Sequence, residues 1–218
     1  MENFILIYPQ IIEQIFEQLD SKNLVNCREV AKSWQDHIDN QNLTWIRIVE
    51  IPTVLQYEDT YLHVAAKTGQ TEIFEMILEE EESKNPRNRY GVTPFHQICR
   101  NGSLQLAELI VQESYELNIQ LNSKDGSGRT AFHDACRNGQ SEIVEMLIEK
   151  SREINIEPNT KDRYGLTAFH LACLNENDDP KVVEMIIEKS KELNVDLNSK
   201  DNDGMTAFHL ACLHAQLR

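Results

Sequence analysis

Apolar residues recur at helical spacing in paired segments along most of the chain. The two clearest copies place them at 143, 144, 147 and 148 and at 182, 183, 186 and 187. Residues three or four apart share one face of a helix, so each copy predicts an amphipathic helix with a polar outer side. A shorter segment rich in small residues precedes each copy and predicts a first helix that packs against the second.

A tetrapeptide of the form Thr-x-x-His opens each first helix and occurs five times. Its histidines are 33, 37, 37 and 39 residues apart: His63, His96, His133, His170 and His209. A polar turn that contains glycine precedes each of the last four copies. Glycine reaches backbone angles that cost other residues energy, so these segments predict tight turns between units. Self-similarity at this period indicates a stacked array of repeats.

This pattern resembles the ankyrin repeat, whose motif is T-P-L-H-x-A at a period near 33 residues. The resemblance covers residues 57–218. It implies an all-α solenoid of about four and a half helix–turn–helix units, with hairpin-like fingers between units.

Three units exceed the usual period, and their extra residues follow the second helix. Four residues make about one helical turn. We therefore expect those second helices to be one turn longer, with Leu117, Ile154 and Leu193 extending the apolar face. The sequence stops after the first helix of a fifth unit, so we expect that unit to be truncated or its end to fray, and we favour truncation.

Residues 1–48 lack the repeat and predict a separate small helical module, joined to the array by a short linker, 49–56. The module resembles the F-box. Its opening is Ile7-Tyr8-Pro9-Gln10-Ile11, and Val30-Ala-Lys32-Ser-Trp34 lies near its end. The alternative is a divergent helical cap that shields the first repeat unit.

The F-box resemblance implies docking onto a Skp-type adaptor, which links the chain to a cullin–RING ubiquitin ligase. The physical basis of such docking is burial of an apolar helical face in a groove. The adaptor-binding positions carried over from the resemblance are Ile7, Tyr8, Pro9, Ile11, Ile12, Phe16, Leu19 and Leu24.

The charge and the cysteine content of the chain indicate which partners and which cellular compartment it favours. The chain has 21 Lys and Arg against 36 Asp and Glu, a formal net charge of −15. Nucleic-acid binding depends on basic residues that neutralise phosphates, so this charge disfavours nucleic acid and also anionic membranes. Five cysteines without a secretory feature favour reduced thiols, and hence the cytoplasm or the nucleus.

The motif His-x-x-Cys occurs in four units, and histidine and cysteine are both ligands of zinc. Zinc needs about four ligands within roughly 2.3 Å. Neighbouring units lie about 8–10 Å apart, which is too far for two copies to close one site. We therefore interpret each histidine as a hydrogen-bond partner of the preceding threonine and each cysteine as a small buried residue. We expect no metal, no cofactor and no catalytic site.

In ankyrin repeats, the fingers and first helices line the concave surface that usually binds partners. This resemblance gives the candidate target-binding residues Lys67, Arg89, Tyr90, Arg100, Asn101, Arg129, Arg137, Asn138, Arg163, Tyr164 and Leu174. Arginine dominates this set, whereas the second helices carry glutamates. Because guanidinium groups pair with carboxylate and phosphate, we expect an acidic or phosphorylated target.

Two functions fit these patterns. The first is a substrate-recognition subunit of an SCF-type cullin–RING ubiquitin ligase, in which the F-box docks to the adaptor and the repeats bind the target. The second is an ankyrin scaffold or inhibitor without ligase function, whose N-terminal helices only cap the solenoid. An enzyme has no motif to support it. Co-purification with a Skp-type adaptor separates the first two.

The adaptor contact is predicted to depend on the apolar opening of the module. Changing Ile11 and Phe16 together to Ala removes two side chains whose burial is worth about 1.5–3 kcal/mol each. We expect the amount of adaptor recovered in a pull-down to fall while the circular dichroism of the repeats is unchanged. Full recovery of the adaptor by the double variant would count against the F-box interpretation.

Overall fold

The computed structural model describes residues 59–80, 83–175 and 180–216. By its contacts the chain divides into two units, Met1–Gln56 and Tyr57–Arg218, and every described residue lies in the second. The predicted N-terminal module, 1–48, and linker, 49–56, lie outside the described residues. So do the predicted adaptor contacts: Ile7, Tyr8, Pro9, Ile11, Ile12, Phe16, Leu19 and Leu24.

The described residues form helices and turns, and no strand occurs among them, which confirms the all-α prediction. The helices are α6 (Tyr61–Thr68), α7 (Thr71–Glu80), α8 (Pro94–Asn101), α9 (Leu104–Glu113), α10 (Ala131–Arg137), α11 (Ser141–Glu149), α12 (Ser151–Ile154), α13 (Ala168–Ala172), α14 (Lys181–Lys189) and α15 (Ala207–Gln216). None of these described helices combines the length and the apolar character that a membrane span requires.

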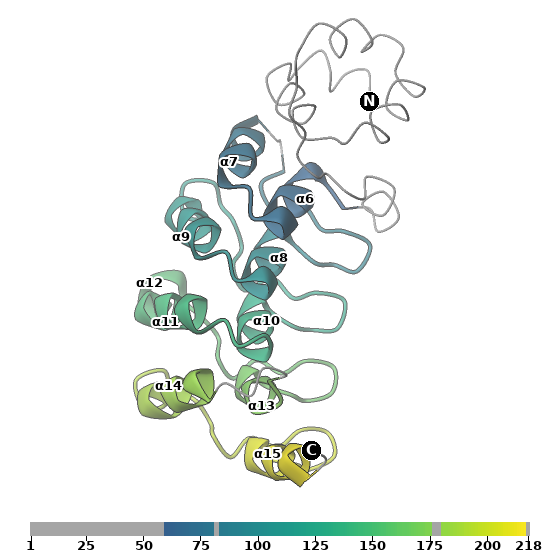
Figure 1. The fold of residues 1–218 in the computed structure, drawn as a ribbon, viewed down its shortest axis with the longest axis vertical. Coiled ribbons are helices and arrows are strands. Elements are labelled where there is room, and N and C mark those ends of the chain that lie inside the picture. The colour runs from purple at the N-terminus through teal and green to yellow at the C-terminus, as the bar shows by residue number, and fades with distance from the viewer. Residues whose placement is uncertain (1–58, 81–82, 176–179, 217–218) are drawn as a thin grey trace, which may run out of the picture. The chain divides into compact units, whose positions relative to one another are not determined.

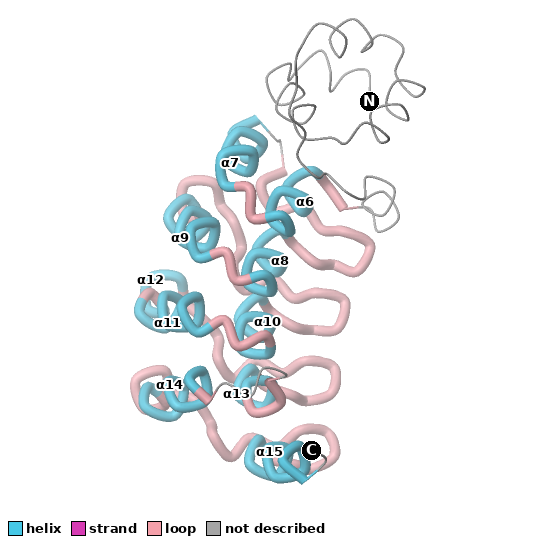
Figure 2. The backbone as a smooth tube through the Cα atoms, viewed as in Figure 1, coloured by secondary structure: helices cyan, strands magenta, loops and turns pink. Residues whose placement is uncertain are grey.

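The helices of unit Tyr57–Arg218 stack in two layers (Figure 1). The first helices α6, α8, α10, α13 and α15 contact one another in chain order, and α11 contacts both α9 and α14 in the second layer. Figure 2 shows the long loops projecting from the first-helix layer, on the side away from the second helices. Each unit therefore contacts chiefly its neighbours, as in other solenoids.

Each first helix begins at the predicted threonine. Thr93, for example, is in the extended conformation, and its backbone N–H donates to His96 Nδ1 at 3.2 Å. The Thr93 hydroxyl lies 2.8 Å from the same nitrogen. This reciprocal capping satisfies donors that would otherwise be orphaned at the helix start.

Helices α6 and α8 end at the left-handed Gly69 and Gly102, with φ of 70° and 83°, and α10 is followed by Asn138 and then by the left-handed Gly139, with φ of 66°. Glycine adopts this conformation without the steric cost that a Cβ would impose. The chain reverses there, and the second helix starts two residues after each glycine. A short connection of this kind forces the two helices of a unit to run antiparallel and to pack against each other.

The prediction of longer second helices needs correction. Helices α9, α11 and α14 end at Glu113, Glu149 and Lys189, and the extra residues form a separate turn, which is long enough in one unit to be α12. In each case the turn closes at an asparagine with φ near 50°: Asn118, Asn155 and Asn194. Leu117, Ile154 and Leu193 lie in these turns and are only half-buried.

The left-handed asparagines end the turns in one recurring way. The N–H of the following residue donates to the carbonyl five residues earlier, as in Ile119 to Ser114 at 2.9 Å and Val195 to Ser190 at 2.8 Å. This is the Schellman arrangement, for which asparagine is the usual substitute for glycine. It redirects the chain toward the next finger one turn later than in the shorter first unit.

The core lies between the two layers and between successive units. Its largest fully buried side chains are Phe74, Phe95, Leu62, Ile98, Leu106, Ile110, Ile143, Leu147, Leu171 and Ile186. The phenylalanines of the repeated tetrapeptide are buried at Phe95, Phe132 and Phe169, whereas Phe208 on α15 is 75% exposed. Full burial of such side chains stabilises the fold by about 1.5–3 kcal/mol each.

The loops between units end in four five-residue fingers, 88–92, 125–129, 162–166 and 201–205, numbered 1 to 4. In each, the N–H of the first residue donates to the carbonyl of the fifth, and the N–H of the fourth, a glycine, donates to the carbonyl of the first. The first residue is Asn88, Asp125, Asp162 or Asp201, and its side-chain oxygen accepts from the third and fifth N–H groups. Asn and Asp favour such turns because the side chain bonds to nearby backbone.

Successive fingers are bonded backbone to backbone. The N–H groups of Gly126, Arg163 and Asn202 donate to the carbonyls of Tyr90, Ser127 and Tyr164 at 2.6, 2.8 and 3.0 Å. The approach is close enough that a Cβ on Gly165 would lie 2.7 Å from the backbone nitrogen of Asn202. A Cβ on Gly204 would meet nothing within 4 Å, although both glycines have φ of 78°.

Comparing Gly165→Ala with Gly204→Ala separates the destabilisation due to backbone strain from that due to the close approach of fingers 3 and 4. Both variants incur the left-handed penalty, about 1–2 kcal/mol. Only Gly165→Ala also forces fingers 3 and 4 apart, which we expect to add about 1–3 kcal/mol of destabilisation. Urea unfolding followed by circular dichroism measures the difference, and equal losses for the two variants would contradict the close packing of the fingers.

Candidate interaction surface

A histidine connects each unit to the next. Each Nδ1 accepts from its own threonine, while Nε2 donates across the junction: from His63 to the Val92 carbonyl at 2.8 Å, and from His96 to that of Arg129 at 3.0 Å. His133 reaches the Thr160 carbonyl at 3.0 Å, and His170 reaches that of Met205 at 3.3 Å. The predicted threonine contact is confirmed, and the bond across the junction is an addition to it.

These bonds need a neutral imidazole with its proton on Nε2, because Nδ1 is an acceptor. Burial lowers the pKa of His63 and His96 below the ordinary value of 6.5, and lowers that of His133 to about 4. At neutral pH these three histidines therefore remain uncharged and hold the carbonyls of the adjacent unit.

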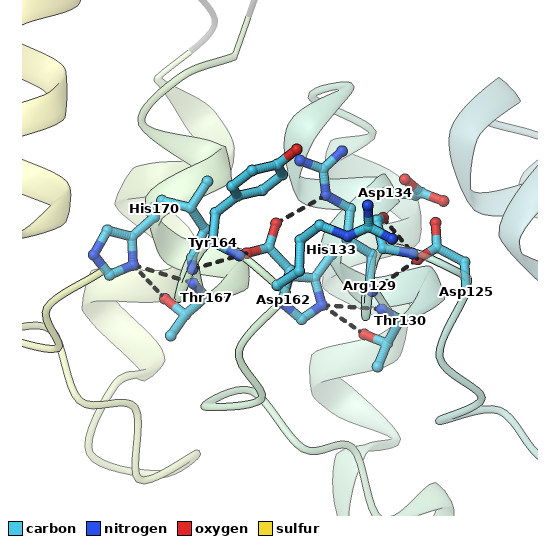
Figure 3. A network of polar contacts seen from close by, with 12 residues as sticks. Asp125, Arg129, Thr130, His133, Asp134, Asp162, Tyr164, Thr167 and His170 are labelled. Carbon is cyan, nitrogen blue, oxygen red and sulfur yellow. Dashed lines mark hydrogen bonds and ion pairs between the residues drawn. The ribbon is translucent and has the colours of Figure 1, made fainter. Parts of the chain in front are cut away.

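Arg129 and Asp162 form an ion pair between fingers 2 and 3 (Figure 3). Arg129 Nε lies 3.1 Å from Asp162 Oδ2, and the Asp162 side chain is fully buried. Its other oxygen accepts from the backbone N–H groups of Tyr164 and Leu166 at 2.8 and 3.0 Å. Both oxygens of this carboxylate are thus satisfied inside the array, as a buried charge requires.

A second ion pair joins the first helices α8 and α10. Arg100 Nη2 lies 2.9 Å from Asp134 Oδ2, with the Arg100 side chain 39% exposed and that of Asp134 2% exposed. Burial raises the pKa of Asp134, and the positive charge of the adjacent Arg100 offsets part of this rise. The Gln140 side chain donates to the Arg100 carbonyl at 3.1 Å and so satisfies an orphaned carbonyl at the end of α8.

The structure assigns contacts within the array to much of the candidate target-binding set. Besides Arg100 and Arg129, Arg163 donates to the Gly126 carbonyl, Asn101 to that of Lys67 at 2.7 Å, and Asn138 to that of Asp134 at 2.8 Å. Of the other members, Lys67, Arg137 and Leu174 lie at the C-terminal ends of first helices or just beyond them. Lys67 is exposed, and Arg137 and Leu174 are half-buried.

The fingers expose aromatic and cationic side chains together. Tyr90 is 49% exposed and Tyr164 is 57% exposed, and both occupy the third position of their finger. The guanidinium carbon of Arg89 lies 5.0 Å from the centroid of the Tyr90 ring, within cation–π range. Arg89 and Arg163 are also exposed, so this part of the candidate set faces solvent in fingers 1 and 3.

The second helices expose acidic side chains instead. Their exposed glutamates are Glu72, Glu75, Glu79, Glu108, Glu142, Glu145, Glu149, Glu184 and Glu188.

Beyond α9 lies a cleft of about 440 Å³ between the turns at 114–123 and 153–155. Tyr115, at its edge, is 94% exposed.

Burial determines the chemistry of the cysteines. It raises the pKa of Cys99 and Cys136 well above the ordinary value, and raises that of Cys173 to about 11. Such thiols stay protonated, whereas a metal or an electrophile requires the thiolate. Among the described residues, no cluster of three or more His, Cys, Asp or Glu side chains could hold a metal ion.

Comparison with known families agrees with this geometry. The model of ankyrin repeats matches residues 62–162 and 152–218, in three copies. The chain belongs to the ankyrin repeat family. The model of the F-box domain matches residues 9–46, so an F-box precedes the ankyrin array, and both predicted resemblances are confirmed. Both modules are typically non-catalytic adaptor or interaction domains.

A curated relative is an ankyrin repeat protein of Rickettsia bellii (strain RML369-C). It is 29% identical over 129 residues, which cover 52% of this chain and 53% of the relative. The chain thus spans about half the length of this relative.

Sequence reasoning missed two features of the ankyrin array. Asp134 and Asp162, the buried partners of the arginines, lie 34 and 33 residues from Arg100 and Arg129, close to one repeat period. A basic residue also precedes every finger: Arg87, Lys124, Lys161 and Lys200. The interval of 37 to 39 residues between the last three could have revealed that pattern from the sequence.

The buried histidines predict that the ankyrin array loses stability in mild acid. A histidine whose pKa is depressed on folding stabilises the array fully above its unfolded pKa, near 6.5, and loses this contribution as pH falls toward the folded value, about 4 for His133. Between pH 7 and pH 5 this histidine alone contributes a loss of about 2 kcal/mol. Urea unfolding at the two pH values measures it.

His133→Gln tests the assignment to one residue, because glutamine does not titrate. The variant should be less stable at pH 7 but should show a smaller loss between pH 7 and pH 5. His209 is exposed and makes the same contact with its threonine, so His209→Gln is the matched control. An identical pH dependence in both variants would exclude His133 as the source.

Proposed function

We propose that this protein is a substrate-recognition subunit of an SCF-type cullin–RING ubiquitin ligase. The observation that carries the proposal is the F-box match at residues 9–46 in one chain with an ankyrin array. F-box domains generally bind Skp-type adaptors, and ankyrin repeats generally bind protein targets. One chain with both modules is suited to hold a target beside the ligase.

The contacts of the array support its use as a receptor. Units are joined by the histidine bonds, by the finger-to-finger backbone bonds and by two ion pairs with buried carboxylates. A surface fixed in this way loses little conformational entropy when a partner binds. The fingers present exposed tyrosine and arginine, which are enriched in the hot spots of protein interfaces.

In this role the F-box would dock through its apolar opening and leave the array outside the adaptor interface. The proposed partners are a Skp-type adaptor with its cullin–RING ligase and a protein target. The proposed activity of the chain is non-catalytic, because ubiquitin transfer would be performed by the rest of the ligase.

Co-expression of the full chain with a Skp-type adaptor tests the proposal. We expect the two to co-elute from a size-exclusion column as a stable complex, and we expect the adaptor to be lost when residues 1–48 are deleted. Gly165→Ala, which alters only the array, should retain the adaptor. Failure of the intact chain to bind adaptor, with the array folded by circular dichroism, would leave an ankyrin scaffold or inhibitor as the function.

A further inference from the structure

Fingers 1 to 3, each with the basic residue before it, form a cationic strip on an acidic protein. We call the segments 87–92, 124–129 and 161–166 the finger edge. They contain six Lys or Arg and two Asp, a formal net charge of +4, whereas the chain as a whole carries −15. The corresponding segment of finger 4, 200–205, has one Lys and two Asp, so the positive charge is confined to the first three fingers.

The carboxylates of the finger edge are bonded within the array. Asp162 is fully buried, with both oxygens bonded to Arg129 and to backbone N–H groups. Asp125 Oδ1 accepts from the Ser127 N–H, the Ser127 hydroxyl and the Arg129 N–H, all at 2.8–2.9 Å. The cations are placed differently, because Arg87, Arg89, Lys124, Lys161 and Arg163 are all exposed.

Three of the exposed cations are bonded to the neighbouring unit. Arg87 Nη1 donates to the Lys124 carbonyl at 2.6 Å, and Lys161 Nζ donates to the Lys200 carbonyl at 2.6 Å. Arg163 donates one bond to the Gly126 carbonyl. A guanidinium has five N–H donors, so one or two such bonds fix the side chain and leave donors for a ligand carboxylate.

Two exposed tyrosines lie on either side of finger 2, at the centre of this strip. The Tyr90 and Tyr164 rings are about half exposed, and their backbone carbonyls are bonded to the next finger. Finger 2, between them, carries Gly126 and Gly128 and a serine whose hydroxyl is bonded to Asp125. Its own tip residues are small, and the Arg163 guanidinium from finger 3 reaches its Gly126 carbonyl, so the two tyrosine rings are separated by a short cationic stretch.

We propose that the finger edge binds an extended, acidic segment of the target protein, with carboxylates on the exposed cations and apolar side chains packed against the two tyrosines. The tyrosines are two units apart, about 16–20 Å at the usual helix packing distance. An extended chain covers this span with about five or six residues. The inference rests on one part of the proposed function, namely that the ankyrin array, rather than the F-box, holds the target.

The exposed side chains of the finger edge, rather than Arg100 and Arg129, are the proposed ligand-binding cations. Arg100 and Arg129 already neutralise buried carboxylates, and removing either would leave a buried charge unpaired. They are therefore poor partners for an external carboxylate and unsuitable positions for a binding test. The exposed finger-edge side chains can be changed without touching either ion pair.

A random dodecapeptide library displayed on phage and selected on the full chain provides the probe. Synthetic copies of the enriched peptides are then measured by fluorescence anisotropy. We expect enrichment of Asp and Glu together with aliphatic or aromatic residues, and affinity that weakens with added salt because exposed charges are screened.

Two double variants and two matched controls locate the binding surface. Tyr90→Ala with Tyr164→Ala should weaken binding about tenfold or more, as loss of interface hot spots does. Arg89→Ala with Arg163→Ala should weaken binding and also reduce its salt dependence. The controls Tyr115→Ala and Arg152→Ala remove side chains that are 94% and 83% exposed outside the finger edge, and they should bind as the parent chain does.

The proposal is overturned if selection yields no peptide that binds, if the peptides show no excess of Asp and Glu over the input library, or if both double variants bind as tightly as the controls. Adaptor co-elution of the same variants separates this result from the proposed function. Variants that keep the adaptor but lose the peptide support the finger edge. Peptide binding without any adaptor complex would reject the ligase role alone.

Discussion

The array depends on one neutral imidazole at each junction. Its Nδ1 accepts from the threonine that starts its own helix, and its Nε2 donates to a carbonyl of the next unit. Only the Nε2–H tautomer makes both contacts, so the start of a helix and the position of the neighbouring unit are fixed by the same ring. The finger bonds, the ion pairs and the close approach of the glycines all require the register that this contact sets.

A consequence of this register is that opposite charges separate between the interior and the surface. Asp134 and Asp162 are buried because arginines one unit away reach them, and Asp125 is half-buried because finger 2 closes around it. Exposed lysines and arginines then remain along fingers 1 to 3, while the outer helices carry the exposed glutamates. The described part of the array thus has two electrostatically different sides, although the chain as a whole is strongly negative.

Local signals in the sequence predicted local structure well. Thr-x-x-His identified the helix starts, and the turn glycines identified the fingers, because both depend on a few consecutive residues. Arg100 and Arg129 were predicted as exposed cations, since their partners lie about one repeat away and become neighbours only when the units stack. The separate turn after α9, α11 and α14 was missed because an asparagine in the left-handed conformation looks, in sequence, like an ordinary polar residue of a continuing helix.

The cysteines at equivalent positions of successive units differ in access to solvent. Cys99 and Cys136 are buried, Cys173 is intermediate and Cys212 is exposed. A thiol enclosed in a junction reacts with an alkylating reagent only while that junction is open, because a buried, protonated sulfur is not a nucleophile. The chain therefore contains internal chemical reporters, whose labelling rates record how often each part of the stack opens, and opening is expected to be easier where fewer neighbouring units hold the thiol in place.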